Sequence, residues 1–176
     1  QGYFLCVSRW QEYKNVQTLV KAYALASKQY NCLPKLILVG KPVDNYIEPA
    51  KLISELNLKE SIKIMRDLSD NELAFLYDNA LINIFPSLHE GFGLSVLEGL
   101  KRGCPSIDHK FTSTSEVSGA AGIHIDMNSP EELAETLLTL CKNKDLQIIL
   151  KQNSILRAKE FSWDHSIKTL LNIYFG

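Results

Sequence analysis

Short apolar runs alternate along the chain with segments whose apolar residues recur at helical spacing. The runs at residues 3–7 and 81–85 are nearly continuous, which is typical of parallel strands buried on both faces. Between such runs, Val16, Leu19 and Val20 fall on one face of a helix. The full pattern predicts strands at 3–7, 35–39, 61–65, 81–85, from 105 and at 122–125, and helices at 16–29, 46–56, 69–80, 95–102, 129–141, 145–160 and 162–174.

Strands that alternate with helices are joined by right-handed crossovers and form a parallel sheet with helices on both faces. We therefore expect an α/β fold: a doubly wound, Rossmann-like parallel sheet of about six strands, in a single domain over residues 1–176. Ligands of such sheets bind beyond the carboxyl ends of the strands. The expected functional loops are those that leave these ends, at 8–15, 40–44, 66–68 and 87–94.

Several predicted helix ends carry capping signals. Ser69–Glu72 and Ser95–Glu98 have the Ser-x-x-Glu form of a capping box, in which the two side chains bond free backbone N–H groups. Ser129 stands before a proline, which favours the first helical position, and a glutamate follows at 132. Gly103 follows the helix at 95–102 as its expected left-handed cap.

Composition indicates the class of protein, and charge argues against nucleic-acid binding. Of the 176 residues, 45% are hydrophobic and 22% charged, which is typical of one globular domain. The net charge is −1, so there is no basic field to hold DNA or RNA, and we expect no nucleic-acid partner.

The cysteines and the chain start bear on the setting of the protein. Its four cysteines form no Cys-x-x-Cys pair, and Cys6 and Cys104 lie in or beside apolar runs, so reduced thiols in a cytoplasm are the simpler interpretation. No run of about 18 apolar residues is present to span a membrane. The chain begins at Gln1 without a methionine and enters a predicted strand at once, so we expect a domain excised from a longer protein.

The most informative stretch is 85–98, which passes from a strand through a glycine-bearing loop into a helix. Glycines let the backbone approach a ligand closely, and the first N–H groups of a helix favour an anion. Glu90 and Glu98 bracket the loop, and a carboxylate accepts hydrogen bonds from neighbouring hydroxyls such as those of a sugar or ribose. Taken singly, Glu98 would be only a capping residue and Glu90 only a solvated loop residue.

This stretch resembles a known family. Glu90-Gly91-Phe92-Gly93-Leu94-x-x-x-Glu98, followed by Gly103-Cys104-Pro105, is similar to the Glu-x7-Glu signature of retaining glycosyltransferases of the two-Rossmann-domain (GT-B) type, in particular family 4. The resemblance extends over nearly the whole chain, from Arg9 to Trp163. It implies the C-terminal, donor-binding half of such an enzyme.

The resemblance also implies roles for individual residues. Arg9 and Lys14 match the pair that stabilises the diphosphate leaving the donor sugar, although alone they would be solvated surface cations. Glu90 would bind hydroxyls of the transferred sugar, and Glu98 those of the ribose. Backbone N–H groups near the sugar and phosphates would come from Phe92, Gly93 and Leu94.

Two other positions concern the base. The loop around Met65 and Arg66 would face the nucleobase. Many relatives have glycine where Arg66 stands, so the base pocket is altered or Arg66 stacks on the base.

The histidines give little signal: His89 borders the site, and His124 alternates with isoleucines as a structural strand residue would.

These observations lead to one functional hypothesis and two alternatives. The chain would be the donor domain of an enzyme that moves a hexose from a GDP- or UDP-sugar to a glycan or lipid-linked acceptor, with no metal, since no Asp-x-Asp motif or His/Cys cluster appears. The acceptor would bind largely in an absent N-terminal domain, so this chain alone would bind nucleotide but turn over little. The full-length protein would be cytoplasmic, with peripheral association at the inner face of the membrane left open. The alternatives are a sugar-nucleotide epimerase and a non-catalytic, flavodoxin-like binding module.

Overall fold

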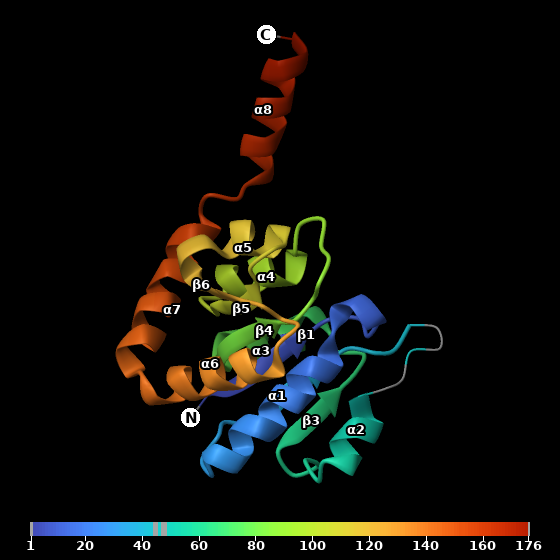
Figure 1. Cartoon of the computed structure of the whole chain (residues 1–176). Coiled ribbons are helices and arrows are strands. Elements are labelled where there is room, and N and C mark those ends of the chain that lie inside the picture. Colours follow the sequence, from blue (N-terminus) through green and yellow to red (C-terminus); the bar gives the residue numbers. More distant parts are fainter. Residues whose placement is uncertain (1, 44–45, 47–48, 176) are drawn as a thin grey trace.

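A six-stranded parallel sheet forms the centre of the molecule (Figure 1). The structure, a computed structural model, describes residues 2–43, 46 and 49–175. The strand order is β3-β2-β1-β4-β5-β6, so the winding reverses between β1 and β4. This is the arrangement of a doubly wound sheet, and it confirms the predicted fold class. The strands are β1 (Tyr3–Val7), β2 (Leu36–Val39), β3 (Ile62–Met65), β4 (Ala80–Phe85), β5 (Ser106–His109) and β6 (Gly122–Ile125).

Helices cover both faces of the sheet (Figure 1). They are α1 (Val16–Gln29), α2 (Pro49–Glu55), α3 (Asp70–Asn79), α4 (Leu94–Lys101), α5 (Ser113–Ser118), α6 (Pro130–Lys142), α7 (Lys144–Ala158) and α8 (Trp163–Phe175), with 3-10 turns η1 (Glu12–Lys14) and η2 (Gly119–Ala121). The predicted helices are found within a few residues of their expected ends, except that part of the predicted 46–56 helix lies outside the described residues. Helix α5 was not predicted.

The two cores follow from the alternation of side chains along buried strands. Phe4 and Cys6 of β1 face the layer of α1, α2 and α6, whereas Leu5 faces the opposite side and packs with Leu76 of α3 and with Cys104. Helices α4 and α5 continue that second layer, and α7 contributes to both cores. Because both faces are buried, β1, β2 and most of β4 are apolar, whereas β5 (Ser106–His109) carries buried polar side chains.

Two of the three predicted serine caps are found. Ser69 Oγ accepts from the Glu72 N–H, and the Glu72 carboxylate accepts from the Ser69 N–H at 2.8 Å, so this capping box is confirmed. Ser129 Oγ likewise accepts from the Glu132 N–H at 3.1 Å, with proline next to it. The Glu132 carboxylate instead accepts from the Asp126 N–H at 3.3 Å, which joins the end of β6 to the start of α6.

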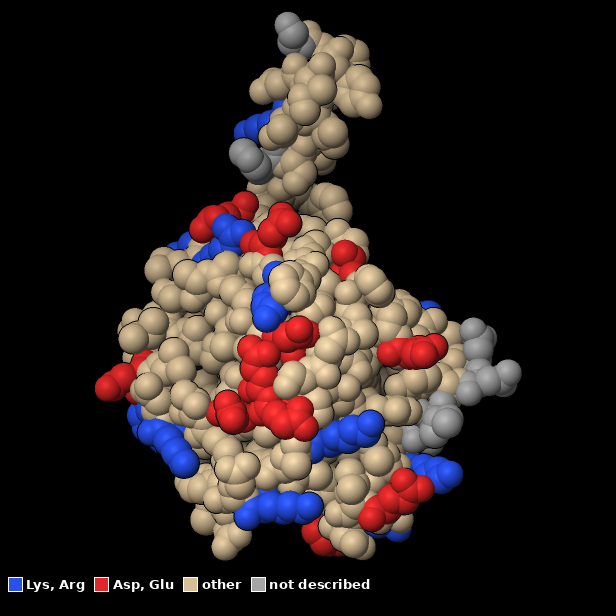
Figure 2. Space-filling model, viewed as in Figure 1, with Lys and Arg blue, Asp and Glu red and all other residues tan. Residues whose placement is uncertain are grey.

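The last helix, α8, stands away from the rest of the molecule (Figure 1). Its large apolar side chains are at least half exposed: Trp163, Ile167, Leu170, Leu171, Ile173, Tyr174 and Phe175. Figure 2 shows it as a mostly uncharged projection above a body that carries charges of both signs. Over the described ranges, no helix is long and apolar enough to cross a bilayer.

Candidate functional site

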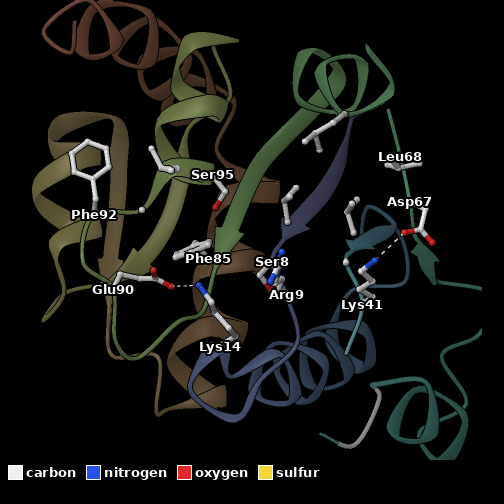
Figure 3. A pocket seen from close by; sticks show the side chains of 16 residues that line it. Ser8, Arg9, Lys14, Lys41, Asp67, Leu68, Phe85, Glu90, Phe92 and Ser95 are labelled. Atoms are coloured by element: carbon white, nitrogen blue, oxygen red, sulfur yellow. Dashed lines mark hydrogen bonds and ion pairs between the residues drawn. The ribbon is translucent and has the colours of Figure 1, made fainter. Parts of the chain in front are cut away.

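A cavity of about 590 Å³ lies at the carboxyl ends of the central strands, where the winding of the sheet reverses (Figure 3). We name it the switch-point cavity. Doubly wound sheets bind their ligands in this crevice. It is lined by Val7, Ser8, Arg9, Lys14, Val39, Gly40, Lys41, Asp67, Leu68, Leu73, Phe85, Glu90, Phe92, Gly93, Leu94 and Ser95.

An ion pair between Lys14 and Glu90 crosses one side of the switch-point cavity (Figure 3). Each side chain is only 14% exposed. Lys14 belongs to η1 after β1, and Glu90 to the loop after β4, so the fold brings together residues 76 positions apart. The Lys14 ammonium also lies 5.2 Å from the ring centroids of Tyr13 and Phe85, which restrict its position.

Two further cations line the switch-point cavity. Arg9 is exposed at the end of β1, beside Ser8 (Figure 3). Lys41, after β2, forms an exposed ion pair with Asp67 at 3.3 Å. Sequence reasoning placed the loop of Lys41 at the site but did not single out this residue. The available signal was a cation directly after the glycine that ends a buried strand.

The start of α4 differs from the prediction. The helix begins at Leu94 and its N-cap is Gly93, without a side-chain cap, so the predicted Ser95–Glu98 capping box is wrong. Gly93 has φ +101°, and a Cβ there would lie 2.7 Å from the Thr114 methyl group. Both facts require glycine at this position. The helix therefore begins one residue early, with its first N–H groups at the cavity.

Gly40 is required at the opposite wall for a similar reason. Its φ is +147°, and a Cβ would lie 1.9 Å from the carbonyl oxygen of Ser8. The loops after β1 and β2 therefore approach each other at backbone distance. This close approach brings Arg9 and Lys41 to the same cavity.

The cavity wall also holds polar groups whose bonding capacity is unused. The Oγ atoms of Ser8 and Ser95 are buried and have no hydrogen-bond partner among the described residues. Figure 3 shows both side chains at the cavity. A buried hydroxyl without a partner costs free energy, so a ligand that bonded to these groups would recover it.

Six of the nine predicted site residues line the switch-point cavity, namely Arg9, Lys14, Glu90, Phe92, Gly93 and Leu94. The ring of Phe92 turns away from Lys14 (Figure 3) and packs edge-on against Phe161, at 5.9 Å between centroids. Its contribution to the cavity is therefore largely its backbone. The roles assigned to these six residues stay predictions.

The other three predicted residues lie outside this lining. Met65 packs at the end of β3. The Arg66 guanidinium lies 5.6 Å from the ring centroid of the buried Trp10. Glu98 lies on α4 and is exposed as a whole residue. Its carboxyl group is partly shielded from water, which raises its pKa, and a hydrogen bond with the Tyr77 hydroxyl opposes this effect. Their roles toward a base or ribose also stay predictions.

Helix α5, which sequence reasoning missed, supports the loop that carries Glu90. The Ser113 hydroxyl donates to the carbonyl oxygen of Glu90 at 2.8 Å. Thr114 packs against Gly93 and bonds to the Thr112 hydroxyl at 2.6 Å. The loop after β4 is thus fixed at two points by the segment after β5.

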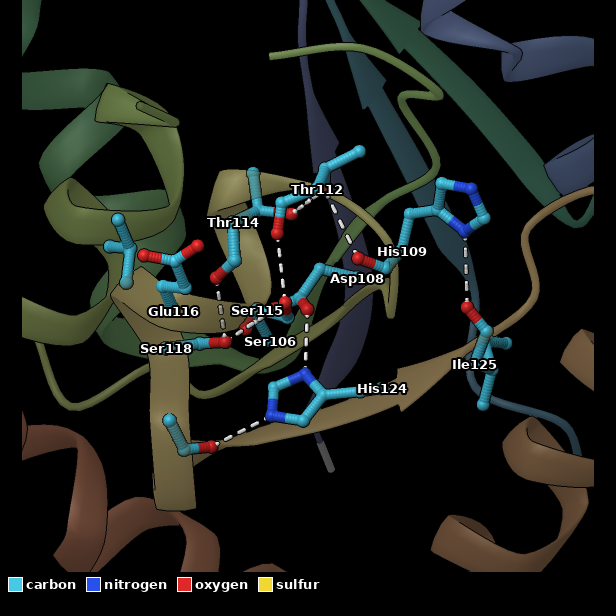
Figure 4. A network of polar contacts seen from close by, with 12 residues as sticks. Ser106, Asp108, His109, Thr112, Thr114, Ser115, Glu116, Ser118, His124 and Ile125 are labelled. Atoms are coloured by element: carbon cyan, nitrogen blue, oxygen red, sulfur yellow. Dashed lines mark hydrogen bonds and ion pairs between the residues drawn. The ribbon is translucent and has the colours of Figure 1, made fainter. Parts of the chain in front are cut away.

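Helix α5 is in turn anchored by a buried polar network (Figure 4). Asp108 is fully buried and accepts from the hydroxyls of Ser106 at 2.6 Å and Ser118 at 2.7 Å. The His124 ring bonds to Asp108 at 2.7 Å and to the Gly119 carbonyl at 3.0 Å. Since both ring nitrogens face acceptors, the imidazolium form is favoured, and the hydrogen bond to Asp108 raises the pKa of His124.

The cationic side chains at the cavity and the N-terminus of α4 suit an anionic ligand. Apolar residues of the same lining, among them Val7, Val39 and Phe85, suit a flat or ring-shaped group beside it. Among the described residues, no group of three or more His, Cys, Asp or Glu side chains is placed to hold a metal ion.

Residues 1–157 match the sequence model of the family described as Glycosyl transferases group 1. Among curated proteins, the O-antigen chain mannosyltransferase B of Escherichia coli is 29% identical over 174 residues, which cover 99% of this chain and 46% of that protein. The chain thus spans about half the length of this relative.

Solved structures share the fold. The C-terminal domain of a glycosyl transferase group 1 family protein (LpcC) from Francisella tularensis has a TM-score of 0.79 and 21% identity, over 90% of this chain and 85% of that one. A TarM variant from S. aureus, in complex with fondaparinux, α-GlcNAc-glycerol and UDP, has a TM-score of 0.84 and 18% identity, over 99% of this chain and 36% of that one.

Proposed function

The chain belongs to the group 1 glycosyl transferases, and we propose that it is the C-terminal, donor-binding domain of a retaining enzyme that transfers a hexose from a GDP- or UDP-sugar to a glycan or lipid-linked acceptor. The observation that carries the proposal is the switch-point cavity, in which Arg9, Lys14 and the N-terminus of α4 converge with Glu90. A diphosphate needs cations and N–H donors, and a sugar needs a hydrogen-bond acceptor such as a carboxylate next to them.

In the proposed complex, the diphosphate lies between the cations and the first N–H groups of α4. Arg9 binds it as a planar fork and Lys14 as a point charge, and each charge-assisted bond contributes roughly 1.5–3 kcal/mol. Glu90 holds Lys14 in place before the donor binds and accepts from sugar hydroxyls afterwards. The buried hydroxyls of Ser8 and Ser95 supply further bonds to the donor.

The proposed transfer breaks one bond at the anomeric carbon and forms another there, with no metal taking part. The bond from the anomeric carbon to the diphosphate oxygen breaks, and its electron pair stays on the diphosphate. The acceptor oxygen bonds to that carbon on the same face, and the hydroxyl proton passes to the departing diphosphate. Negative charge grows on the leaving group in the transition state, where Arg9 and Lys14 stabilise it more than in the ground state.

We further propose that the rest of the full-length enzyme, an N-terminal acceptor domain, covers α8. An isolated helix of this length is marginal in water, and its apolar side chains are exposed in this chain. Burial against the other domain would stabilise it. The full-length enzyme would work on the cytoplasmic side, with peripheral association at the inner face of the membrane where the acceptor is lipid-linked.

The test is thermal unfolding of the chain with GDP, UDP, ADP, NAD and FMN, for the native sequence and for Lys14→Ala, with Lys21→Ala as control. Lys21 is an exposed lysine of α1 outside the cavity lining. A ligand at 100 times its dissociation constant adds about 2.7 kcal/mol of stability, which raises the midpoint by several degrees. We expect a shift with GDP or UDP that Lys14→Ala reduces and Lys21→Ala does not.

Other outcomes would contradict the proposal. The absence of a shift with any nucleotide would rule out the donor site and favour the non-catalytic, flavodoxin-like binding module, and a shift with FMN or NAD alone would contradict a sugar-nucleotide donor. In the full-length enzyme, net conversion of the sugar nucleotide without acceptor would favour an epimerase, and an inverted glycosidic product would rule out retention.

A further inference from the structure

A second, shallower hollow of about 500 Å³ adjoins the switch-point cavity. We name it the side hollow. It is formed by η1, the loop after β4 and the segment after β5, and its lining includes Tyr13, His89, Glu90, Phe111, Thr112 and Ser113. It therefore lies at the same carboxyl edge of the sheet as the cavity, which is where doubly wound sheets bind ligands.

Of the residues that the structure describes, Glu90 alone lines both the switch-point cavity and the side hollow. Its carboxylate is paired with Lys14, which belongs to the cavity side. A ligand in the side hollow would thus meet a ligand in the cavity at Glu90. A transferase needs this relation, because the accepting hydroxyl must lie next to the carbon that is transferred.

The chemistry of the side hollow differs from that of the cavity. Among the described residues its lining contains no lysine or arginine, although the Lys110 ammonium lies 5.0 Å from the ring centroid of Phe111. It offers two aromatic side chains at its surface, Tyr13 at 39% and Phe111 at 74% exposure. The apolar face of a pyranose ring stacks on such rings, and its hydroxyls need partners such as the Glu90 carboxylate and the His89 imidazole.

The side hollow is also held in shape before any ligand arrives. The Leu88 N–H donates to the Tyr13 carbonyl at 2.8 Å, which ties the loop after β4 to η1. The Ser113 hydroxyl donates to the Glu90 carbonyl, which ties the same loop to α5. Preorganised walls lower the entropic cost of binding, so a weak neutral ligand gains from them.

We propose that the side hollow is an acceptor subsite: it binds a neutral pyranose of the acceptor by stacking on Phe111 and places one of its hydroxyls toward Glu90. This inference rests on the proposed function and goes beyond it, because it assigns part of acceptor recognition to the donor domain itself. Phe111 is a specificity-determining residue, and Glu90 joins the two subsites.

The probe is methyl α-D-mannopyranoside, chosen because the relative named above is a mannosyltransferase. Saturation-transfer NMR would measure its binding to the 176-residue chain with the nucleoside diphosphate site saturated, for the native sequence, Phe111→Ala and the control Phe75→Ala. Phe75 is exposed on α3 and lines neither hollow, so the two variants remove the same ring from different places. The isolated chain is suitable because a related C-terminal domain has been crystallised by itself.

We expect millimolar binding that Phe111→Ala weakens about tenfold, the equivalent of 1.4 kcal/mol, and that Phe75→Ala leaves unchanged. Nucleoside diphosphate binding, followed by the midpoint of unfolding, should be equal in all three chains.

The possible failures are distinguishable. If the native chain bound no nucleotide, the proposed function would be contradicted. Nucleotide binding without glycoside binding, or glycoside binding equal in Phe111→Ala, would overturn the acceptor subsite alone. Glycoside binding that is seen without the nucleoside diphosphate but disappears when its site is saturated would place the glycoside in the switch-point cavity and would also overturn the subsite.

Discussion

The Lys14–Glu90 and Asp108–His124 ion pairs each contain a mostly buried carboxylate, and they differ in how much of their bonding capacity is used. Asp108 accepts from two hydroxyls and an imidazole, and both nitrogens of His124 have acceptors. Within the described part of the chain Lys14 has one hydrogen-bond acceptor, Glu90, and both side chains line the switch-point cavity. One pair is complete within the fold, whereas the other retains donors and acceptors for a ligand.

This difference separates a structural pair from a candidate functional pair without reference to any relative. A buried pair whose groups are all satisfied fixes a conformation, and here it holds α5, which supports the Glu90 loop. A pair that lines a cavity and has donors and acceptors without partners can form hydrogen bonds with a substrate. The Asp108 network and the Lys14 pair would therefore respond differently to the loss of one member.

The largest expected effect is on transfer by the full-length enzyme after Lys14→Ala. Loss of one donor that stabilises the leaving diphosphate should lower kcat/KM by about 10²–10³. The free energy of unfolding should also fall, but by less than the roughly 3–5 kcal/mol that follows the loss of one partner of a fully buried pair, since Glu90 keeps 14% of its side chain exposed at the cavity. Steady-state kinetics and urea unfolding measure the two quantities. Equal activity would show that Lys14 serves the fold alone, and Lys21→Ala is the matched control.

The next effect is on stability, after His124→Ala. The variant leaves the Asp108 carboxylate buried with hydroxyl donors alone, and it should lower the free energy of unfolding by roughly 1–3 kcal/mol. His89→Ala removes an exposed imidazole for which the structure records no hydrogen bond, and should change it by less than about 0.5 kcal/mol. Urea unfolding would compare the three chains. Equal values for both variants would contradict the structural role of the Asp108–His124 pair.

The fold was largely predictable because apolar periodicity determines it. The strands at 3–7 and 122–125 are found as expected, and Gly103 has the predicted left-handed conformation, with φ +70°. Helix α5 was missed because Ser113–Ser118 is short and polar, and its contacts with Asp108 and Gly93 come from distant parts of the chain. The start of α4 was misplaced because Gly93, packed against Thr114, replaces the serine cap.

The site was predictable in part, and the limit has the same cause. The strand–loop–helix pattern indicated the loop of Glu90, the family resemblance implied that Lys14 meets the same ligand, and the structure brings those two residues together. Lys41 and the side hollow depend on how separate loops meet, which no local pattern contains. His124 was expected to be structural, but its partner Asp108 is adjacent only across two paired strands.

A smaller effect concerns pH. The pKa of His124 is raised in the folded chain, so its stabilisation is complete below the ordinary value of 6.5 and is lost as pH rises through the raised folded value. The native chain should therefore lose stability relative to His124→Ala as pH rises above 6.5. Urea unfolding between pH 6 and 9 measures the difference. A constant difference between the two chains over that range would contradict the linkage.

The smallest expected effect is at the third ion pair, Lys41–Asp67, whose side chains are 64% and 76% exposed. Asp67→Asn keeps the shape of the side chain and suits the left-handed backbone of this position, at φ +50°. An exposed pair contributes little, so the free energy of unfolding should change by less than about 0.5 kcal/mol. Nucleoside diphosphate affinity should rise by about twofold, because a negative charge leaves the cavity rim and Lys41 is released toward the phosphates. Titration calorimetry at low salt would measure the gain, which should fade at about 0.5 M salt. Weaker binding in Asp67→Asn would mean that the Lys41–Asp67 pair positions the cation for its ligand, as Glu90 positions Lys14.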